Sequence, residues 1–350
     1  MKVAFISTAA IAQTTRSSIS DIQAELAKAQ QELASGRHYD AGLALGYRIS
    51  RSESMRQEFD QLTAIGETNG VLGERITTTQ NALQNLVDDS QAMIATLLGA
   101  RNSPGTAQGV AALDAKVMLE TMVDTLNTTF NGERIFGGIK TDVAPLNDYY
   151  STPASLAKQS VDADFLAAFG MTQTAPTVDT IDATSMQTFL DGAFANNFAS
   201  GPWTANWSNA SDQVVESRIS ISMTVETSVS ANEEPFRQMA QALTMVADLG
   251  GGNLGQSAFQ ALADTAVGLL GQAITGLTLQ QSKIAVAEEG IRQSNERMDL
   301  QKDVLTGGVQ NLEGVDPFEA STRATNLLTQ LETSFALTAR LQRLSLANYL

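Results

Sequence analysis

The sequence predicts a mainly α-helical protein whose two ends form long coiled-coil helices. An N-terminal apolar seam steps by three and four residues, and a C-terminal seam repeats every seven residues. Such spacing keeps one stripe of a helix against a partner helix. Only 6% of the residues are aromatic, so the core must consist largely of small and aliphatic side chains, which suit close helix packing. The first seam contains Ala12, Thr15, Ile19, Ile22, Leu26, Ala29 and Leu33, and the second contains Leu277, Ile284, Ile291, Met298, Leu305 and Leu312.

The first 140 residues are predicted to form a series of helices. The N-terminal helix should end at Gly36, a residue that readily adopts the left-handed conformation that ends helices. Helical spacing resumes after a short polar turn, and a break is expected at Asn69–Gly70. A strict apolar seam then runs through residues 72–97, and a further helix is expected between 112 and 130.

The middle of the chain has a different character. Both tryptophans and four of the seven prolines lie between residues 141 and 207, where the heptads vanish. Alternation of apolar and polar residues over 218–226 is the best strand signal in the chain. Helical spacing returns from Pro235, and glycines at 307, 308 and 314 are expected to separate the long C-terminal seam from the last helix.

This order predicts a chain that runs outward and returns. Residues 1–35 and 315–350 form the predicted terminal coiled-coil polymerisation domain. Residues 36–140 and 211–314 form a helical rod domain with a β-hairpin near 214–230. Residues 141–210 form a small β-rich or mixed outer domain, inserted into the rod and held by its own aromatic core.

Composition excludes several classes of function. A net charge of −16 disfavours nucleic-acid binding, which needs clustered Lys and Arg. The chain has no cysteine and one histidine, His38, so thiolate chemistry and a multi-histidine metal site within one chain are excluded. We therefore expect no enzyme activity, no cofactor and no metal. No stretch approaches the 18 apolar residues of a membrane span, and the first residues are interpreted as the start of a mature helix rather than a cleaved signal.

Three local patterns could suggest chemistry, and each has a simpler explanation. Acidic residues are adjacent at 88–89, 233–234 and 288–289. Adjacent side chains on a helix point about 100° apart, so the two members of a pair are expected to lie on a solvent-exposed face rather than to bind one ligand together. The glycine-rich stretch 250–255 lacks the Lys-Ser/Thr of a phosphate loop and is expected to be a helix-to-helix turn. His38 lies in a polar turn without a serine nucleophile motif.

Three segments carry a family resemblance. Leu33-Ala-Ser-Gly-Arg37, at the end of the N-terminal heptads, resembles a signature of the flagellin superfamily. The segment 131–145, which contains Ile135-Phe-Gly-Gly138, looks like the part of hook–filament junction proteins (the hook-associated protein 3 family) that leaves the first helical block. Asp316-Pro-Phe-Glu-Ala320 looks like the entry of that family's terminal helix. The resemblance covers roughly 1–145 and 212–350 and leaves the middle unassigned.

The resemblance implies a structural protein of the extracellular bacterial flagellum, exported unfolded through the type III channel without a cleaved signal. Its implied partners are other copies of itself, another hook-associated protein, flagellin and an export chaperone. The implied function is an adaptor ring between hook and filament. Flagellin itself, the bulk filament subunit, is the main alternative. A coiled-coil signalling protein and an enzyme sited in the insert are more distant ones.

The assembly interface is predicted on the apolar faces of the terminal helices. A lone heptad helix is marginally stable until a partner covers its seam, so these faces should fold against neighbouring subunits. The candidate residues are Ile19, Ile22, Leu26 and Leu33 in the first helix and Leu331, Phe335, Leu341 and Leu344 in the last.

Overall fold

The computed structural model describes residues 8–103, 105–251 and 253–347, and at 8, 9, 12 and 341–347 the description covers the backbone alone. The chain divides into two compact units. The terminal unit contains residues 1–64 and 297–350, and the central unit contains residues 65–296. Two long helices, α3 (Ile49–Ala100) and α9 (Gln256–Glu313), contribute residues to both units.

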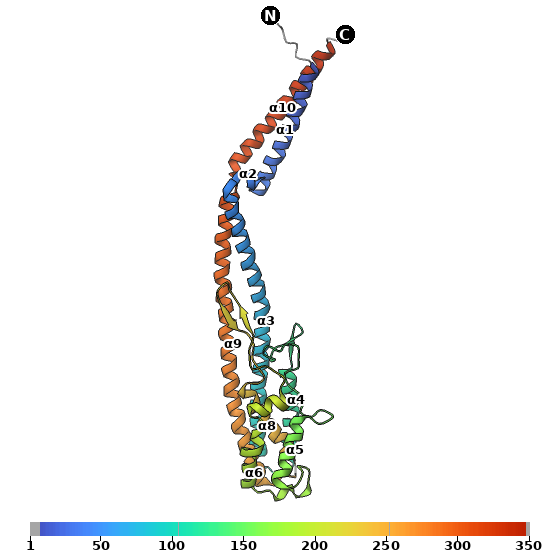
Figure 1. Ribbon diagram of the computed structural model, residues 1–350, viewed down its shortest axis with the longest axis vertical. Coiled ribbons are helices and arrows are strands. Elements are labelled where there is room, and N and C mark those ends of the chain that lie inside the picture. Colours follow the sequence, from blue (N-terminus) through green and yellow to red (C-terminus); the bar gives the residue numbers. More distant parts are fainter. Residues whose placement is uncertain (1–7, 104, 252, 348–350) are drawn as a thin grey trace. The chain divides into compact units, whose positions relative to one another are not determined.

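The terminal unit is built from helices. Two terminal helices, α1 (Thr8–Ser35) and α10 (Pro317–Ala347), lie side by side (Figure 1). The short helices α2 (Ala41–Leu45) and η1 (Gly46–Arg48) lead from α1 into α3. The side chain of Asp40 caps α2 by accepting a hydrogen bond from the backbone N–H of Leu43 at 2.9 Å.

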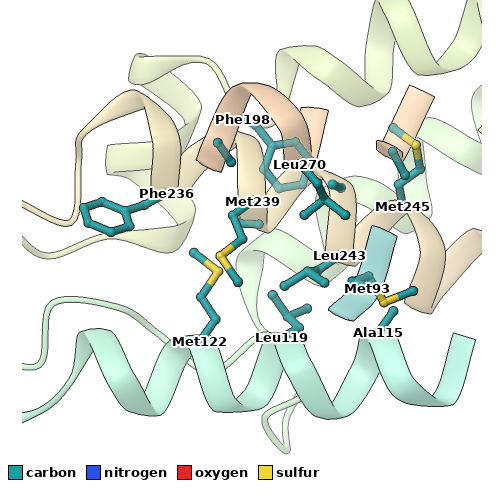
Figure 2. Packing of buried hydrophobic residues seen from close by; sticks show 14 of the residues in the cluster. Met93, Ala115, Leu119, Met122, Phe198, Phe236, Met239, Leu243, Met245 and Leu270 are labelled. Carbon is teal, nitrogen blue, oxygen red and sulfur yellow. The ribbon is translucent and has the colours of Figure 1, made fainter. Parts of the chain in front are cut away.

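The central unit surrounds α8 (Glu234–Thr244) with the other helices (Figure 1). α8 has buried residues on several sides, which is the pattern of a helix enclosed by neighbours. Figure 2 shows Met239 and Leu243 of α8 packed toward Leu119 and Met122 of α4 (Thr106–Leu126). Small and aliphatic side chains make up most of the core cluster, as predicted, but ten aromatic residues also belong to it.

The α3 helix passes through Asn69–Gly70 without the expected break, so that prediction is wrong. The Asn69 side chain is buried, and its Nδ2 donates to the carbonyl oxygen of Ile219 at 2.9 Å and to Oδ1 of Asn295 at 2.7 Å. These hydrogen bonds offset the cost of burying the amide nitrogen within the helix. Tertiary contacts therefore override the turn preference of the Asn-Gly pair.

The α9 helix likewise continues through Gly307 and Gly308 and ends at Glu313, so of the three glycines only Gly314 lies in the connection to α10. A Cβ atom on Gly308 would lie 2.9 Å from Sδ of Met55. Glycine at this position leaves room for the end of the Met55 side chain of α3, and the helix backbone is retained. The predicted seam residues from Leu277 to Leu305 are all buried, which confirms their inward orientation.

The strands form two small hairpins in the central unit. In the first, β1 (Thr129–Phe130) pairs with β2 (Glu133–Arg134) around Asn131 and Gly132, whose positive φ angles of 51° and 85° suit a tight two-residue turn. In the second, β3 (Glu216–Arg218) pairs with β4 (Thr224–Glu226) inside the predicted 214–230 range. The stretch 218–226 therefore contains a turn rather than one continuous strand.

Residues 141–210, which were expected to be β-rich or mixed, fold mainly as short helices joined by loops. Side-chain caps favour these helices, because Ser155 caps α5 (Leu156–Phe169) and Asp182 caps α6 (Ala183–Phe189). Trp203 and Tyr149 both stack on Trp207, with ring centroids 5.2 Å and 5.1 Å from that of Trp207. The remaining short helices are η2 (Pro176–Thr180), η3 (Leu190–Phe194), α7 (Ser200–Pro202) and η4 (Trp203–Trp207).

The aromatic residues of 141–210 do not form a core of their own. They belong to the same buried cluster as α4, α8, the following turn η5 (Met245–Leu249) and α9. Phe198 is one such residue, and Figure 2 shows it near Met239 and Leu270. In the single chain this segment is part of the central unit, and the three-domain division remains a prediction.

Candidate assembly surface

The pair formed by α1 and α10 presents the surface that the sequence assigns to assembly. Asp316 begins α10, since its Oδ1 accepts a hydrogen bond from the N–H of Phe318 at 2.8 Å, and Pro317 occupies the first helical position. Neither α1 nor α10 contains an internal glycine or proline. Both helices can therefore run without kinks over about 40 Å at 1.5 Å per residue.

Little apolar surface is buried between α1 and α10. On α1, Ala29 is fully covered, whereas Ile19, Ile22 and Leu26 are half-buried. On α10 the covered positions step by three and four, and they are Ala320, Ala324, Leu327, Leu331, Ser334 and Thr338. Small and polar residues occupy four of these six positions, so the pair buries little apolar surface and is only weakly stabilised by its own seam.

A second set of apolar side chains on these helices has no cover in the chain. Phe318 is 85% exposed, and Phe335 is 48% exposed. Leu328 and Leu337 of α10 and Ile11 and Leu33 of α1 are also exposed. The helical pair therefore leaves several large apolar side chains in contact with solvent.

The predicted interface residues therefore separate into three groups. Ile19, Ile22, Leu26 and Leu331 are half-buried, on the face where α1 and α10 pair. Leu33 and Phe335 are exposed. The side chains of Leu341 and Leu344 lie outside the described residues. Leu33 departs from its seam because Glu32 takes the covered position in the last turn of α1.

Hydrogen bonds join the connection that follows α1 to the connection that precedes α10. We call this group of residues the polar clasp, and it comprises residues 36–38 and 313–315. Arg37 and Gly314 form an isolated antiparallel bridge. The N–H of Val315 donates to the carbonyl oxygen of Gly36 at 3.0 Å, and the N–H of His38 donates to the carbonyl oxygen of Glu313 at 2.9 Å. The two connections are thus tied to one another through their backbones.

The Glu313 side chain is the centre of the clasp. It is buried, and its carboxylate accepts hydrogen bonds from the hydroxyl of Ser52 and from two nitrogens of Arg56, with Nε of Arg56 at 3.1 Å. The guanidinium of Arg56 lowers the pKa of Glu313 below its ordinary value, aided by the Ser52 hydrogen bond. Glu313 therefore stays ionised and bound to α3.

A second buried carboxylate, Glu32, stabilises the end of α1. Its Oε1 accepts the backbone N–H of Tyr39 at 3.0 Å, and its Oε2 lies 3.2 Å from a guanidinium nitrogen of Arg323 on α10. Nδ1 of His38 lies 3.8 Å from Oε1 of Glu32. Sequence patterns missed both carboxylates, because Arg56 and Ser52 are distant in the chain from Glu313, as Arg323 is from Glu32. The feature of the sequence that pointed to this region was the pair of glycines, Gly36 and Gly314, which follow α1 and α9.

The central unit contains one cluster of charged side chains beside a cavity of about 670 Å³. Lys158 binds Asp162 and Asp248, and the hydroxyl of Tyr149 donates to Asp248 at 3.0 Å. Burial raises the pKa of Asp248, and Lys158 partly offsets this rise. These groups satisfy one another and tie α5 to η5. Within the described ranges, no three His, Asp or Glu side chains gather as metal ligands.

The α9 helix is long and apolar enough to cross a bilayer, by length and composition alone. This differs from the expectation that no stretch would approach a membrane span. Packing inside the protein provides another reason for its apolar character, since Leu270, Ala273 and Leu277 are completely buried in the central unit.

The charge of the chain is divided unevenly between the two units. The central unit has 25 acidic and 10 basic residues, a net charge of −15, whereas the terminal unit has 13 acidic and 12 basic residues, a net charge of −1. Copies of the terminal unit can therefore pack together with little repulsion, whereas copies of the central unit repel one another.

Comparison with known families identifies the two ends of the chain. The model of the bacterial flagellin N-terminal helical region matches residues 6–141, and that of the flagellin C-terminal helical region matches residues 267–350. No curated protein matches the chain significantly.

Two solved structures are similar to the chain. The first, described as a flagellar hook-associated protein from Vibrio parahaemolyticus, has 11% identity and a TM-score of 0.53, covering 76% of this chain and 97% of that one. The second, FlgL from Bacillus cereus, has 12% identity and a TM-score of 0.42, covering 75% and 97%. The first likeness indicates a shared fold.

Proposed function

The chain belongs to the flagellin superfamily, a family of structural proteins of the bacterial flagellum, and we propose that it forms the adaptor ring that joins hook to filament. The apolar side chains that α1 and α10 leave exposed are the observation that carries the mechanism. They lie on a nearly neutral unit, where copies can approach closely. Covering them is the driving force for self-assembly.

The pairing of α1 with α10 refines the proposed interface. Ile19, Ile22, Leu26 and Leu331 hold the helical pair together, and Leu33 and Phe335 are left for neighbouring subunits. We add Phe318, Leu328 and Leu337 to this exposed set. Leu341 and Leu344 remain proposed interface residues, because their spacing in the sequence places them on an apolar face of the last helix.

The adaptor position, rather than that of the bulk filament, is supported by two segments. Ile135-Phe-Gly-Gly138 and Asp316-Pro-Phe-Glu-Ala320 resemble segments of hook–filament junction proteins. In this position the partners are the neighbouring hook-associated protein on one side and flagellin on the other, with an export chaperone before assembly. The protein acts outside the cell, after export without a cleaved signal, and its role is structural rather than catalytic.

The exposed face of α10 provides a direct test. Changing Leu328 and Phe335 together to Glu places charge on this face without disturbing the seam with α1. Cells with this variant should still export the protein, and the exported chain should fold, yet the cells should shed their filaments. Changing the exposed Gln330 and Thr333 to Glu adds the same charge on the side of α10 that Leu337 occupies. Retained filaments in this variant would restrict the contact to the side of Leu328 and Phe335, and lost filaments would extend it to Leu337.

Deletion of residues 331–350 tests the same role more coarsely. The central unit should still fold, and hook–filament attachment should be lost. Normal motility and attached filaments in the deletion strain, or in the Leu328–Phe335 double variant, would contradict the proposal.

Flagellin remains the second candidate, because it shares both matched terminal regions. Quantifying the protein on purified flagella decides between them. A copy number of one ring supports the adaptor, whereas thousands of copies along the filament would identify the chain as flagellin. A hydrolase assay on the full chain tests the more distant enzymatic reading of the 141–210 segment.

A further inference from the structure

The chain contains two Asn-Gly pairs, and the structure places them in opposite surroundings. Asn131 and Gly132 form the exposed tip of the β1–β2 hairpin, whereas Asn69 and Gly70 lie in the interior of α3. An asparagine that precedes a glycine can react with its own backbone, because glycine has no Cβ to block the approach of the side chain to its nitrogen. The surroundings of each pair decide whether this reaction occurs in the folded protein.

The reaction is a cyclisation followed by hydrolysis, and water is its only co-reactant. The backbone nitrogen of the glycine attacks Cγ of the asparagine side chain and forms a bond with it. The bond from Cγ to the side-chain nitrogen breaks, and this nitrogen leaves as ammonia with the proton that the backbone nitrogen loses. Water then opens the resulting imide ring at either carbonyl carbon. One opening gives aspartate, and the other gives isoaspartate, in which the backbone runs through Cγ.

The tip of the hairpin leaves Asn131 free to react. Its side chain is exposed and makes no hydrogen bond to any residue that the structure describes, and the N–H of Gly132 likewise donates to no backbone carbonyl among them. The two strands contain two residues each. So short a hairpin is only marginally stable by itself, which allows its turn to reach the backbone angles that ring closure requires.

Asn69 provides the contrasting case in the same chain. Its side chain is buried, and its Nδ2 is held by the carbonyl oxygen of Ile219 at 2.9 Å and by Oδ1 of Asn295 at 2.7 Å. The N–H of Gly70 lies within α3, where it donates to a carbonyl oxygen in the preceding turn of the helix. Rotation of the side chain and loss of the backbone proton are both opposed, so the fold protects this pair.

We propose that Asn131 is a site of spontaneous modification in the folded protein, where it converts to aspartate and isoaspartate while Asn69 stays intact. The conversion requires no enzyme. It adds one negative charge to a central unit whose net charge is already −15. The converted fraction therefore increases with the age of the molecule, and this holds whether or not the chain forms the adaptor ring.

Isoaspartate should open the tip of the hairpin and leave its base in place. A tight two-residue turn has no room for an extra backbone atom, so the pairing of Phe130 with Glu133 beside the turn should be lost. The base is held from outside the hairpin. Arg75 of α3 donates to Oε2 of Glu133 at 3.0 Å and to the carbonyl oxygen of Arg134 at 3.3 Å. The modification should therefore have a local effect and leave the central unit folded.

The second Asn-Gly pair supplies an internal control for the test. Purified full-length protein is aged at mildly alkaline pH, both in buffer and in concentrated guanidinium chloride, and peptide mass spectrometry measures the loss of each side-chain amide. In buffer, Asn131 should convert at least about tenfold faster than Asn69, because Asn69 reacts only when α3 opens. In denaturant the two residues should convert at similar rates, since a glycine follows each of them.

An Asn131→Gln variant, aged in parallel, tests the effect on the hairpin. Glutamine would have to close a six-membered ring, which forms far more slowly, so this variant should keep the amide protection of Phe130 and Glu133 that the aged natural chain loses. Equal conversion of Asn131 and Asn69 in buffer would overturn the proposed site. Equal loss of protection in the aged variant would overturn its effect on the turn.

Discussion

Arg56 on α3 binds the carboxylate of Glu313, the last residue of α9, with two guanidinium nitrogens. The same glutamate residue accepts the backbone N–H of His38 on its carbonyl oxygen. One residue therefore fixes the end of α9, the base of α3 and the connection that follows α1. The stability of the clasp should depend strongly on this single pair.

Replacing Arg56 with Ala should loosen the clasp and leave the central unit folded. The change leaves a buried carboxylate with only Ser52 as its side-chain donor, at an expected cost of about 1.5–3 kcal/mol. Backbone amides of His38 and Val315 should then exchange hydrogen about 10- to 100-fold faster. Arg292→Ala is the matched control. It removes exposed ion pairs with Glu289 and Glu296, which should leave exchange at the clasp unchanged.

Acidification should open the clasp through the same residue. Because Arg56 lowers the pKa of Glu313, ionised Glu313 stabilises the fold above its ordinary value of 4.5, and this stability is lost as the pH falls through the lower folded-state pKa. Amide protection at 313–316 should therefore decrease below about pH 4.5 after correction for intrinsic exchange. Glu313→Gln should abolish this part of the pH dependence. Unchanged dependence in that variant would assign the effect to other carboxylates.

Three glycine-to-alanine substitutions should have different effects. Gly314→Ala should be the most damaging, because its Cβ would lie 2.4 Å from the carbonyl oxygen of Gln310. Gly36→Ala has space but a φ of +68°, so strain of about 1–2 kcal/mol is expected. Gly66→Ala, in open space within α3, should stabilise its helix by about 0.5–1 kcal/mol. The thermal unfolding temperatures of the three purified variants measure this order. Equal shifts in all three variants would contradict the prediction.

Alkaline conditions should unfold the central unit. Burial raises the pKa of Tyr149 and Tyr150 well above the ordinary value of 10, with a smaller rise from the charge of Asp248. The protonated phenols stabilise the fold below pH 10, and this contribution is lost as the pH rises further. Tyrosinate absorbance should therefore appear together with loss of helicity. Changing both residues to Phe should move alkaline unfolding to higher pH, and an unchanged midpoint would contradict this account.

Self-association should strengthen as salt is added. The central units repel one another through a net charge of −15 each, whereas the contacts that we propose are apolar. Salt screens the repulsion and leaves apolar burial intact. Sedimentation velocity of the full chain at rising ionic strength measures the effect. Weaker association at high salt would show that attraction between opposite charges, rather than apolar contact, joins the copies.

The sequence predicted the long helices well, because heptad spacing is a local pattern. The inward orientation of Leu277 and Ile291 is one example. Prediction from the sequence failed where the local structure depends on contacts with residues that are distant in the chain. Gly308 alone predicts a helix break, and only the structure shows that Met55 occupies the space beside it. Asn69 alone predicts a turn, and only the structure shows its hydrogen bonds to Ile219 and Asn295.

The candidate surface was only partly predictable for the same reason. Spacing identified an apolar face on each terminal helix, yet it could not tell which residues the two helices use against one another. Half-burial of Leu331 and exposure of Phe335, four residues apart on one helix, depend on the position of α1. The clasp at Glu313 could not be foreseen, since Ser52 and Arg56 lie more than 250 residues earlier in the chain.

The bridge between Arg37 and Gly314 also has a mechanical consequence. A flagellum transmits torque, and any load that passes from the terminal helices to the rest of the same subunit must cross the two connections that follow Ser35 and precede Asp316. Because backbone hydrogen bonds tie these connections together, tension applied to either helix is shared between two covalent strands. A subunit loosened at the clasp would carry the same load unevenly and would yield at a lower force, even where its assembly is normal.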